Sequence, residues 1–170
     1  MRLMQALFLC VISASLLACS GSPEPRGPRL TLYAVHPAGG FGYDLGSVNG
    51  EDLGRAPDPG HDLEKGYFHS YKILGQVDLT GTDAGSQLAA YLEEEASLPQ
   101  GMIAGCFEPR HALRVVRDGQ VSDYVLCFAC RQFDWYEGND LRWAGKQTLD
   151  PAWRERFTAP LTAAGIELAE

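Results

Sequence analysis

The dipeptide Asp118-Gly119 constrains the fold of this chain more than any other feature, because it alone separates two apolar, β-prone segments. Asp-Gly is a strong signal for a two-residue hairpin turn, in which both central residues need a left-handed backbone. The hairpin joins strands expected over Ala112–Arg117 and Gln120–Trp135. If Arg117 faces Gln120, the numbers of any two facing residues sum to 237. The sequence therefore predicts an antiparallel sheet built around this hairpin.

Other strands are expected on both sides of the hairpin. Apolar or alternating segments predict strands over Leu30–Val35, Tyr67–Thr80 and Met102–Phe107, with a break in the second near Gly75. A turn or weak strand is expected over Gly138–Lys146. These segments give a sheet of about four to six strands.

Two helices complete the predicted fold. The first is capped by Thr82 or Asp83 and runs to about Ser97. The second follows Asp150-Pro151, a favourable pair for the N-cap and the first helical position, and ends at Gly165. Pro160 is expected to break or restart this helix. We therefore expect an α+β fold, an antiparallel sheet with two helices on one face.

The first residues have the pattern of an export signal. Arg2 precedes an apolar segment over Ala6–Leu17, which is too short for the ~20 apolar residues that span a hydrocarbon core. The segment Leu16-Leu17-Ala18-Cys19 resembles the lipobox of bacterial lipoproteins. The resemblance implies that Cys19 carries diacylglycerol and that the chain is cut before it. Residues 1–18 are then the signal peptide, 19–29 a lipidated flexible tether and 30–170 a single globular domain.

Charge and the residue after Cys19 indicate where such a lipoprotein resides. Ser20 follows the cysteine, which in the enterobacterial sorting rule of the family favours the outer membrane, facing the periplasm. The net charge of −8 becomes −9 once Arg2 is removed with the signal peptide. An acidic chain without a basic stripe is a poor nucleic-acid binder. The expected partners are the membrane, through the lipid, and an envelope protein.

Three cysteines remain in the globular domain, namely Cys106, Cys127 and Cys130. Because exported proteins meet an oxidising compartment, a disulfide is expected, with Cys106 bridging Cys127 or Cys130. One alternative is a zinc or copper site made by the three thiolates and His111. Another is thiol–disulfide exchange at the Cys127-x-x-Cys130 motif. Outside the metal alternative, no cofactor is expected.

The segments CFEPRH at 106–111 and CFAC at 127–130 resemble a CFxPRH…CFxC pattern of small bacterial proteins. This resemblance covers roughly residues 71–136 and carries no activity with it. Within the first segment, Glu108, Arg110 and His111 combine a carboxylate, a guanidinium and an imidazole, which suits anion binding or proton transfer. These three residues are the catalytic candidates.

The segment 36–66 is rich in Gly, Pro, Asp and Asn and is expected to be a long loop. Within it, His61-Asp62 with Asp52 or Asp58 could ligate a cation, although the spacing matches no calcium-binding loop. Taken together, the sequence favours a membrane-anchored envelope lipoprotein with a binding or structural role rather than an enzyme. The alternative is a periplasmic metal-binding or thiol-redox protein that uses Cys106, His111, Cys127 and Cys130.

Overall fold

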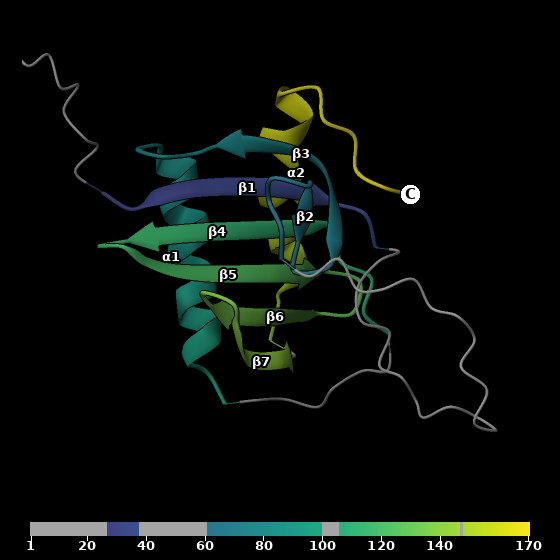
Figure 1. Ribbon diagram of the computed structural model, residues 1–170. Helices are drawn as coiled ribbons and strands as arrows, with labels where there is room; N and C mark the ends of the chain where they lie inside the picture. Colours follow the sequence, from purple (N-terminus) through teal and green to yellow (C-terminus); the bar gives the residue numbers. More distant parts are fainter. Residues whose placement is uncertain (1–26, 38–60, 100–105, 147) are drawn as a thin grey trace, which may run out of the picture.

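The domain is built on one antiparallel sheet of seven strands, in the order β2-β3-β1-β4-β5-β6-β7 (Figure 1). The computed structural model describes residues 27–37, 61–99, 106–146 and 148–170. The strands are β1 (Arg29–Val35), β2 (Tyr67–Phe68), β3 (Tyr71–Asp78), β4 (His111–Arg117), β5 (Gln120–Cys127), β6 (Gln132–Glu137) and β7 (Asp140–Lys146). The expected antiparallel sheet is confirmed, but the expectation of four to six strands was too low. The segment expected to be a lipobox, residues 16–19, lies outside the described residues, as do positions 102–105 of the strand expected over Met102–Phe107.

The central hairpin has the predicted register. Arg117 faces Gln120 and His111 faces Leu126, so that each pair sums to 237. Asp118 and Gly119 form the turn with φ of 52° and 80°. This register places Arg114 directly opposite Asp123, a pairing that matters for the site described below.

The expected single strand over Gln120–Trp135 was wrong, because the chain folds back after Cys127. Residues 128–131 form a turn and β6 then pairs antiparallel with β5, with Cys127 facing Gln132. Arg131 adopts φ 57° in this turn, a left-handed conformation that is uncommon for arginine and that the sequence therefore does not predict. The extra strand accounts for part of the difference in strand number.

The strand expected over Tyr67–Thr80 is also divided, but not at Gly75. Phe68 pairs with Tyr71, so that the two residues between them, His69 and Ser70, form a tight turn. Their φ values are 46° and 74°, although neither is glycine. At Gly75 the strand continues, with a register shift against β1.

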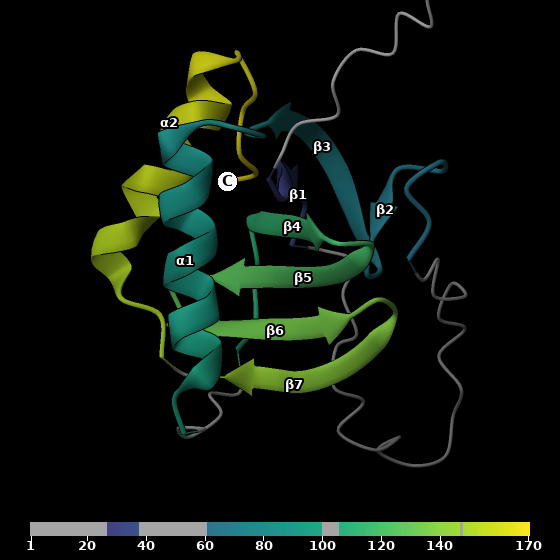
Figure 2. The same cartoon turned by 90° about the vertical axis from the view of Figure 1, so that its left-hand side faces the viewer.

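Both helices cover the same face of the sheet, as predicted (Figure 2). The first, α1 (Asp83–Ser97), begins after Thr82, whose side chain accepts a hydrogen bond from the Gly85 N–H group. Leu88 and Leu92 of this helix are buried in the larger core, where full burial of each stabilises the fold by about 2 kcal/mol.

The second helix, α2 (Arg154–Ala163), follows the short 3-10 helix η1 (Pro151–Trp153). Asp150 caps η1 as expected. Pro160 lies inside α2 and neither breaks nor restarts it. Phe157 and Leu161 are fully buried against the sheet.

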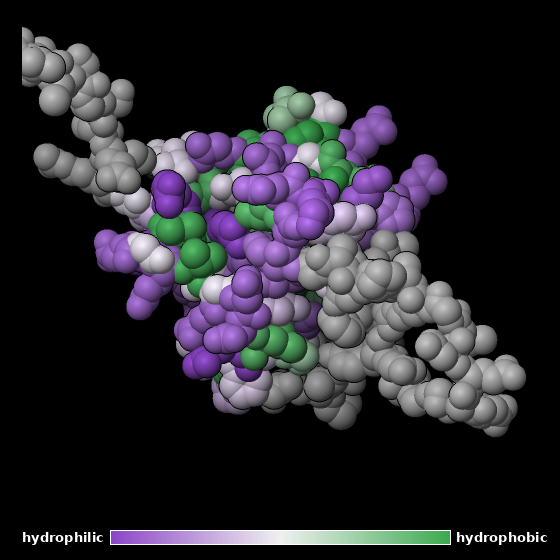
Figure 3. Space-filling model, in the orientation of Figure 1, coloured by the Kyte–Doolittle hydropathy of each residue, from purple (hydrophilic) through white to green (hydrophobic). Residues whose placement is uncertain are grey.

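The opposite face of the sheet is covered by its own edge strand, β2, and by the turn after β2, because this end of the sheet folds over β1. Here Phe68 packs against Tyr33 of β1, at 4.8 Å between ring centroids, within a smaller core that also contains Val125 of β5. The surface of this face is mostly hydrophilic, with apolar side chains in small patches (Figure 3). The sheet therefore has two differently covered faces, a helix-covered face and a hairpin-covered face.

Candidate functional site

The disulfide joins Cys127 to Cys130, which differs from the expected bridge to Cys106. The Cα atoms of Cys127 and Cys130 are 5.3 Å apart, and Cys106 is a free, exposed cysteine. The reason is the turn after β5, which brings together two cysteines that a continuous strand would direct to opposite faces. The main-chain N–H of Cys130 also donates to the Cys127 sulfur at 3.2 Å.

The metal set of Cys106, His111, Cys127 and Cys130 is not assembled. Two of its sulfurs are bonded to each other. His111 faces Leu126, a residue of the helix-side core, so that strand alternation directs Cys127 toward the other face. The expectation of this zinc or copper site is therefore replaced by a disulfide.

The disulfide is shielded from solvent. Cys127 is 1% exposed and Cys130 is 7% exposed, and both belong to a β-hairpin. Catalytic CxxC pairs need an accessible sulfur and commonly use a helix N-terminus to favour the thiolate. The arrangement fits a structural bridge that fixes the β5–β6 turn.

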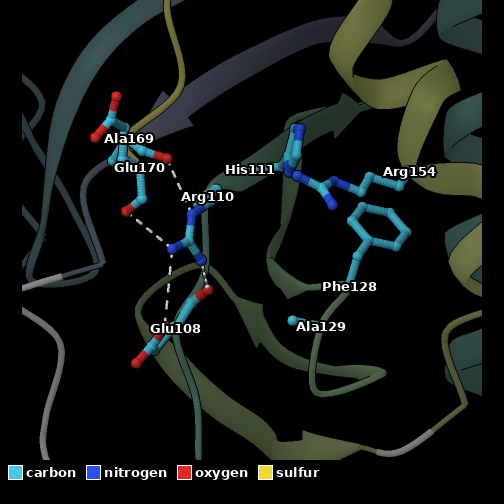
Figure 4. Close-up of a pocket in the computed structure, with 8 residues that line it drawn as sticks. All are labelled: Glu108, Arg110, His111, Phe128, Ala129, Arg154, Ala169 and Glu170. Atoms are coloured by element: carbon cyan, nitrogen blue, oxygen red, sulfur yellow. Dashed lines mark hydrogen bonds and ion pairs between the residues drawn. The ribbon is translucent and has the colours of Figure 1, made fainter.

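The three catalytic candidates do meet at one cavity on the helix-covered face, which we call the helix-side pocket (Figure 4). Its volume is about 340 Å³, within the range for small-molecule sites. The lining residues are Glu108, Arg110, His111, Phe128, Ala129, Arg154, Ala169 and Glu170. The pocket thus unites the CFEPRH segment, the CFAC turn, the start of α2 and the end of the chain.

His111 is a neutral, firmly oriented group in this pocket. It is 2% exposed, and its Nε2 lies 3.1 Å from the Thr158 hydroxyl oxygen. Because that hydroxyl already donates to the Arg154 carbonyl, His111 Nε2–H must be the donor and Nδ1 keeps its lone pair. Burial, with the positive charges of Arg154 and Arg110, lowers the pKa of His111 to about 4.

Arg110 is engaged by the chain itself. Its Nε donates to the Ala169 carbonyl at 3.0 Å, and one Nη donates to the main-chain oxygen of Glu170 at 3.0 Å. The other Nη donates to the Glu108 carbonyl at 3.2 Å. The Glu108 carboxylate is exposed and lies 3.8 Å from Arg110. The carboxylate of Glu108 is therefore paired with Arg110 and not with His111, and the two do not form an acid–base pair.

A second polar site lies on the hairpin-covered face and was not predicted. Arg114 of β4 donates from Nε and Nη2 to the two carboxylate oxygens of Asp123 on β5, at 2.8 and 2.7 Å. His69, from the β2–β3 turn, donates from Nε2 to Asp123 Oδ2 at 2.8 Å. Burial alone raises the pKa of the Asp123 carboxyl, but these hydrogen bonds hold that pKa below its usual value.

His61 completes this group, which we call the histidine–aspartate cluster (His61, His69, Arg114 and Asp123). The Nε2 atom of His61 accepts a hydrogen bond from Arg114 Nη2 at 2.7 Å, while the main-chain N–H of His69 points to His61 Nδ1 at 3.2 Å. A neutral imidazole has one lone pair, so these two donors compete for it. Burial and the neighbouring His69 and Arg114 lower the pKa of His61 to about 4.

The sequence contained one signal for this cluster. The predicted hairpin register pairs Arg114 with Asp123, two opposite charges on one face of a buried sheet. His69 carried no such signal, because it is 54 residues from Asp123 in the chain. Of the residues that could have ligated a cation with His61, Asp62 pairs with Lys65 at 2.8 Å, and Asp52 and Asp58 lie outside the described residues.

No helix among the described residues is long and apolar enough to cross a membrane. Comparisons with known protein families, with curated proteins and with solved structures found no match to this chain.

Proposed function

We propose that this protein is a lipid-anchored binding protein of the bacterial envelope, and that its helix-side pocket binds a small ligand through a carboxylate group. The anchor is the lipid on Cys19, implied by the lipobox at 16–19. Two or more acyl chains hold a domain stably at a membrane, so no spanning helix is needed. Ser20 favours the outer membrane.

The observation that carries the ligand class is the state of Arg154. This side chain is exposed, lines the pocket and makes no ion pair with any described residue. The other arginine of the pocket, Arg110, is occupied by main-chain oxygens. An arginine with free donors beside an aromatic wall, here Phe128, suits a ligand that combines a carboxylate with an apolar part.

Arg154 also has a matched control two residues away. Arg156 lies on the same helix, where its guanidinium is 4.5 Å from the centre of the Trp153 ring, and it does not line the pocket. Substitution of either arginine removes one positive charge from an exposed position. A difference between the two variants therefore reports the pocket and not the net charge.

The test is calorimetric titration of the soluble Cys19→Ser domain with benzoate and with benzamide, its neutral analogue. We expect saturable benzoate binding, at least about tenfold weaker binding of benzamide, and a similar loss in Arg154→Met but not in Arg156→Met, since a hydrogen bond between charged groups contributes about 1.5–3 kcal/mol. Equal affinities for the two compounds, or equal effects of the two substitutions, contradict the proposal.

The anchor has a separate test. In an exporting bacterial host the wild-type protein is expected in the membrane fraction, and Cys19→Ser in the soluble periplasmic fraction. Membrane retention of a Cys19→Ser protein from which residues 1–18 have been removed would show that the lipid is not the anchor.

A further inference from the structure

We propose that the histidine–aspartate cluster is a binding site for a divalent transition metal ion, in which Arg114 occupies the position of the cation while the metal is absent. The metal ligands are His61, His69 and Asp123. This site is independent of the helix-side pocket, because it lies on the opposite face of the sheet.

The three proposed ligands converge on one point. His61, His69 and Asp123 each offer one ligand atom, and the three atoms lie within 4.8 Å of one another. His69 and Asp123 are buried, and β5 and the 61–70 segment bring the three together from distant parts of the chain. Two imidazoles and one carboxylate suit zinc and other first-row divalent metals, and three protein ligands leave a position open for water or a substrate.

A positive charge already lies between these ligands. Nη2 of Arg114 is 2.7 Å from Asp123 Oδ2 and 2.7 Å from His61 Nε2, so that a single cationic nitrogen bridges two of the three ligands. The Arg114 side chain is 18% exposed, whereas that of Asp123 is 0% exposed. Arg114 can therefore leave toward solvent, while the carboxylate cannot.

The backbone is strained at His69, one of the residues that supply a ligand. His69 and Ser70 both have positive φ, and non-glycine residues in that region cost on the order of 1–3 kcal/mol each. Tight turns of this type normally use Asn-Gly or Asp-Gly. The strained turn holds the His69 ring against Tyr136, stacked at 3.7 Å between centroids, with Nε2 directed at Asp123.

When a metal ion replaces the Arg114 guanidinium, the buried Asp123 carboxylate keeps a positive partner. Arg114 and Asp123 together are neutral, and departure of the guanidinium leaves a buried carboxylate that the metal then neutralises. His69 Nε2, which donates to Asp123 without metal, binds the ion in the other neutral tautomer: the ring proton moves to Nδ1 by exchange with solvent, and the Nε2 lone pair becomes the ligand.

The test uses the untagged soluble domain in a Cys106→Ser background, which removes the free thiol as a competing ligand. Titration with Zn²⁺ at pH 7 is followed by calorimetry, and Co²⁺ is added separately to read the coordination from its visible absorption. We expect one ion per chain. His69→Ala and Asp123→Asn are expected to weaken binding more than about 100-fold, beyond the 10- to 100-fold typical of outer partners.

Two further variants make the result specific. His111→Gln removes a buried histidine on the other face and is expected to leave zinc affinity unchanged. Arg114→Met removes the competing cation and is expected to raise zinc affinity about tenfold or more, since a like charge at this distance disfavours the ion strongly. If Arg114→Met does not fold without metal, Arg114→Lys, which keeps the charge but not the fork, provides the comparison.

If neither the Cys106→Ser protein nor its Arg114→Met derivative binds one equivalent of Zn²⁺ while circular dichroism shows both to be folded, the cluster is a permanent ion pair and not a metal site. Binding that survives His69→Ala equally refutes it. Neither outcome affects benzoate binding at the helix-side pocket.

Discussion

At the scale of single residues, His111 couples the stability of the domain to pH. Burial and two nearby arginines lower its pKa from 6.5 to about 4 in the folded protein. The unfolded chain therefore takes up a proton first, and the stabilising contribution, fully present above pH 6.5, is lost as the pH falls toward 4. A shift of this size corresponds to about 3 kcal/mol.

The measurement is denaturant unfolding of the wild type and His111→Gln between pH 7 and 4. We expect the free energy of unfolding of the wild type to fall more steeply than that of the variant by about 3 kcal/mol over this interval. The difference isolates His111, because His61 and Asp134, whose pKa values are lowered to about 4 and raised to about 6, remain in both proteins. Parallel curves contradict the assigned role of His111.

Ser70 offers a second prediction at this scale. Its φ of 74° is strained for serine and natural for glycine. Ser70→Gly is therefore expected to stabilise the domain by about 1 kcal/mol, after the extra freedom of glycine in the unfolded chain is subtracted. Thermal unfolding measures the change, with Ser86→Gly in the exposed first turns of α1 as a control that should destabilise. Destabilisation by both substitutions to the same extent would show that the turn at Ser70 is unstrained.

At the scale of elements, the disulfide fixes the turn between β5 and β6. It closes a short loop, for which chain entropy gives about 2 kcal/mol of stabilisation. The Cys127→Ala, Cys130→Ala double variant is expected to lose about this amount, and the loss should equal that caused by reductant in the wild type.

Alkylation of the unreduced Cys19→Ser domain in denaturant is expected to give one adduct, at Cys106 if residues 1–18 have been removed. Three adducts contradict the bridge.

The elements also show how far the sequence could be interpreted. The register of β4 and β5 was predictable, because Asp118-Gly119 defines both the turn and the pairing. The fold-back after Cys127 was not, because the turn contains neither glycine nor asparagine and relies on Arg131 in a left-handed conformation. The turn at His69-Ser70 was not predictable for the same reason, because it has two left-handed residues and no glycine.

The candidate sites also contain some residues that the sequence could predict and others that it could not. The helix-side pocket was partly predictable, since Glu108, Arg110 and His111 are close in the chain and do line it together. Arg154 was not, because only the docking of α2 brings it there. His69 and Asp123 are likewise joined by tertiary structure alone.

At the scale of the whole molecule, one sheet separates two chemically different sites. The helix-covered face carries a pocket with an exposed arginine, and the hairpin-covered face carries the largely buried histidine–aspartate cluster. Substitutions on one face should therefore leave the other site unchanged, because effects at distant positions without shared partners are additive. This independence makes each proposal testable in the presence of the other.

The most direct test of the proposed binding role is histidine side-chain NMR of the soluble domain during titration with benzoate. We expect the ring resonances of His111 to shift saturably, those of His61 and His69 to remain unchanged, and the shift to disappear in Arg154→Met but not in Arg156→Met. If the His111 resonances do not move, or if they move equally in Arg154→Met, the helix-side pocket is not a carboxylate site and the central claim is wrong.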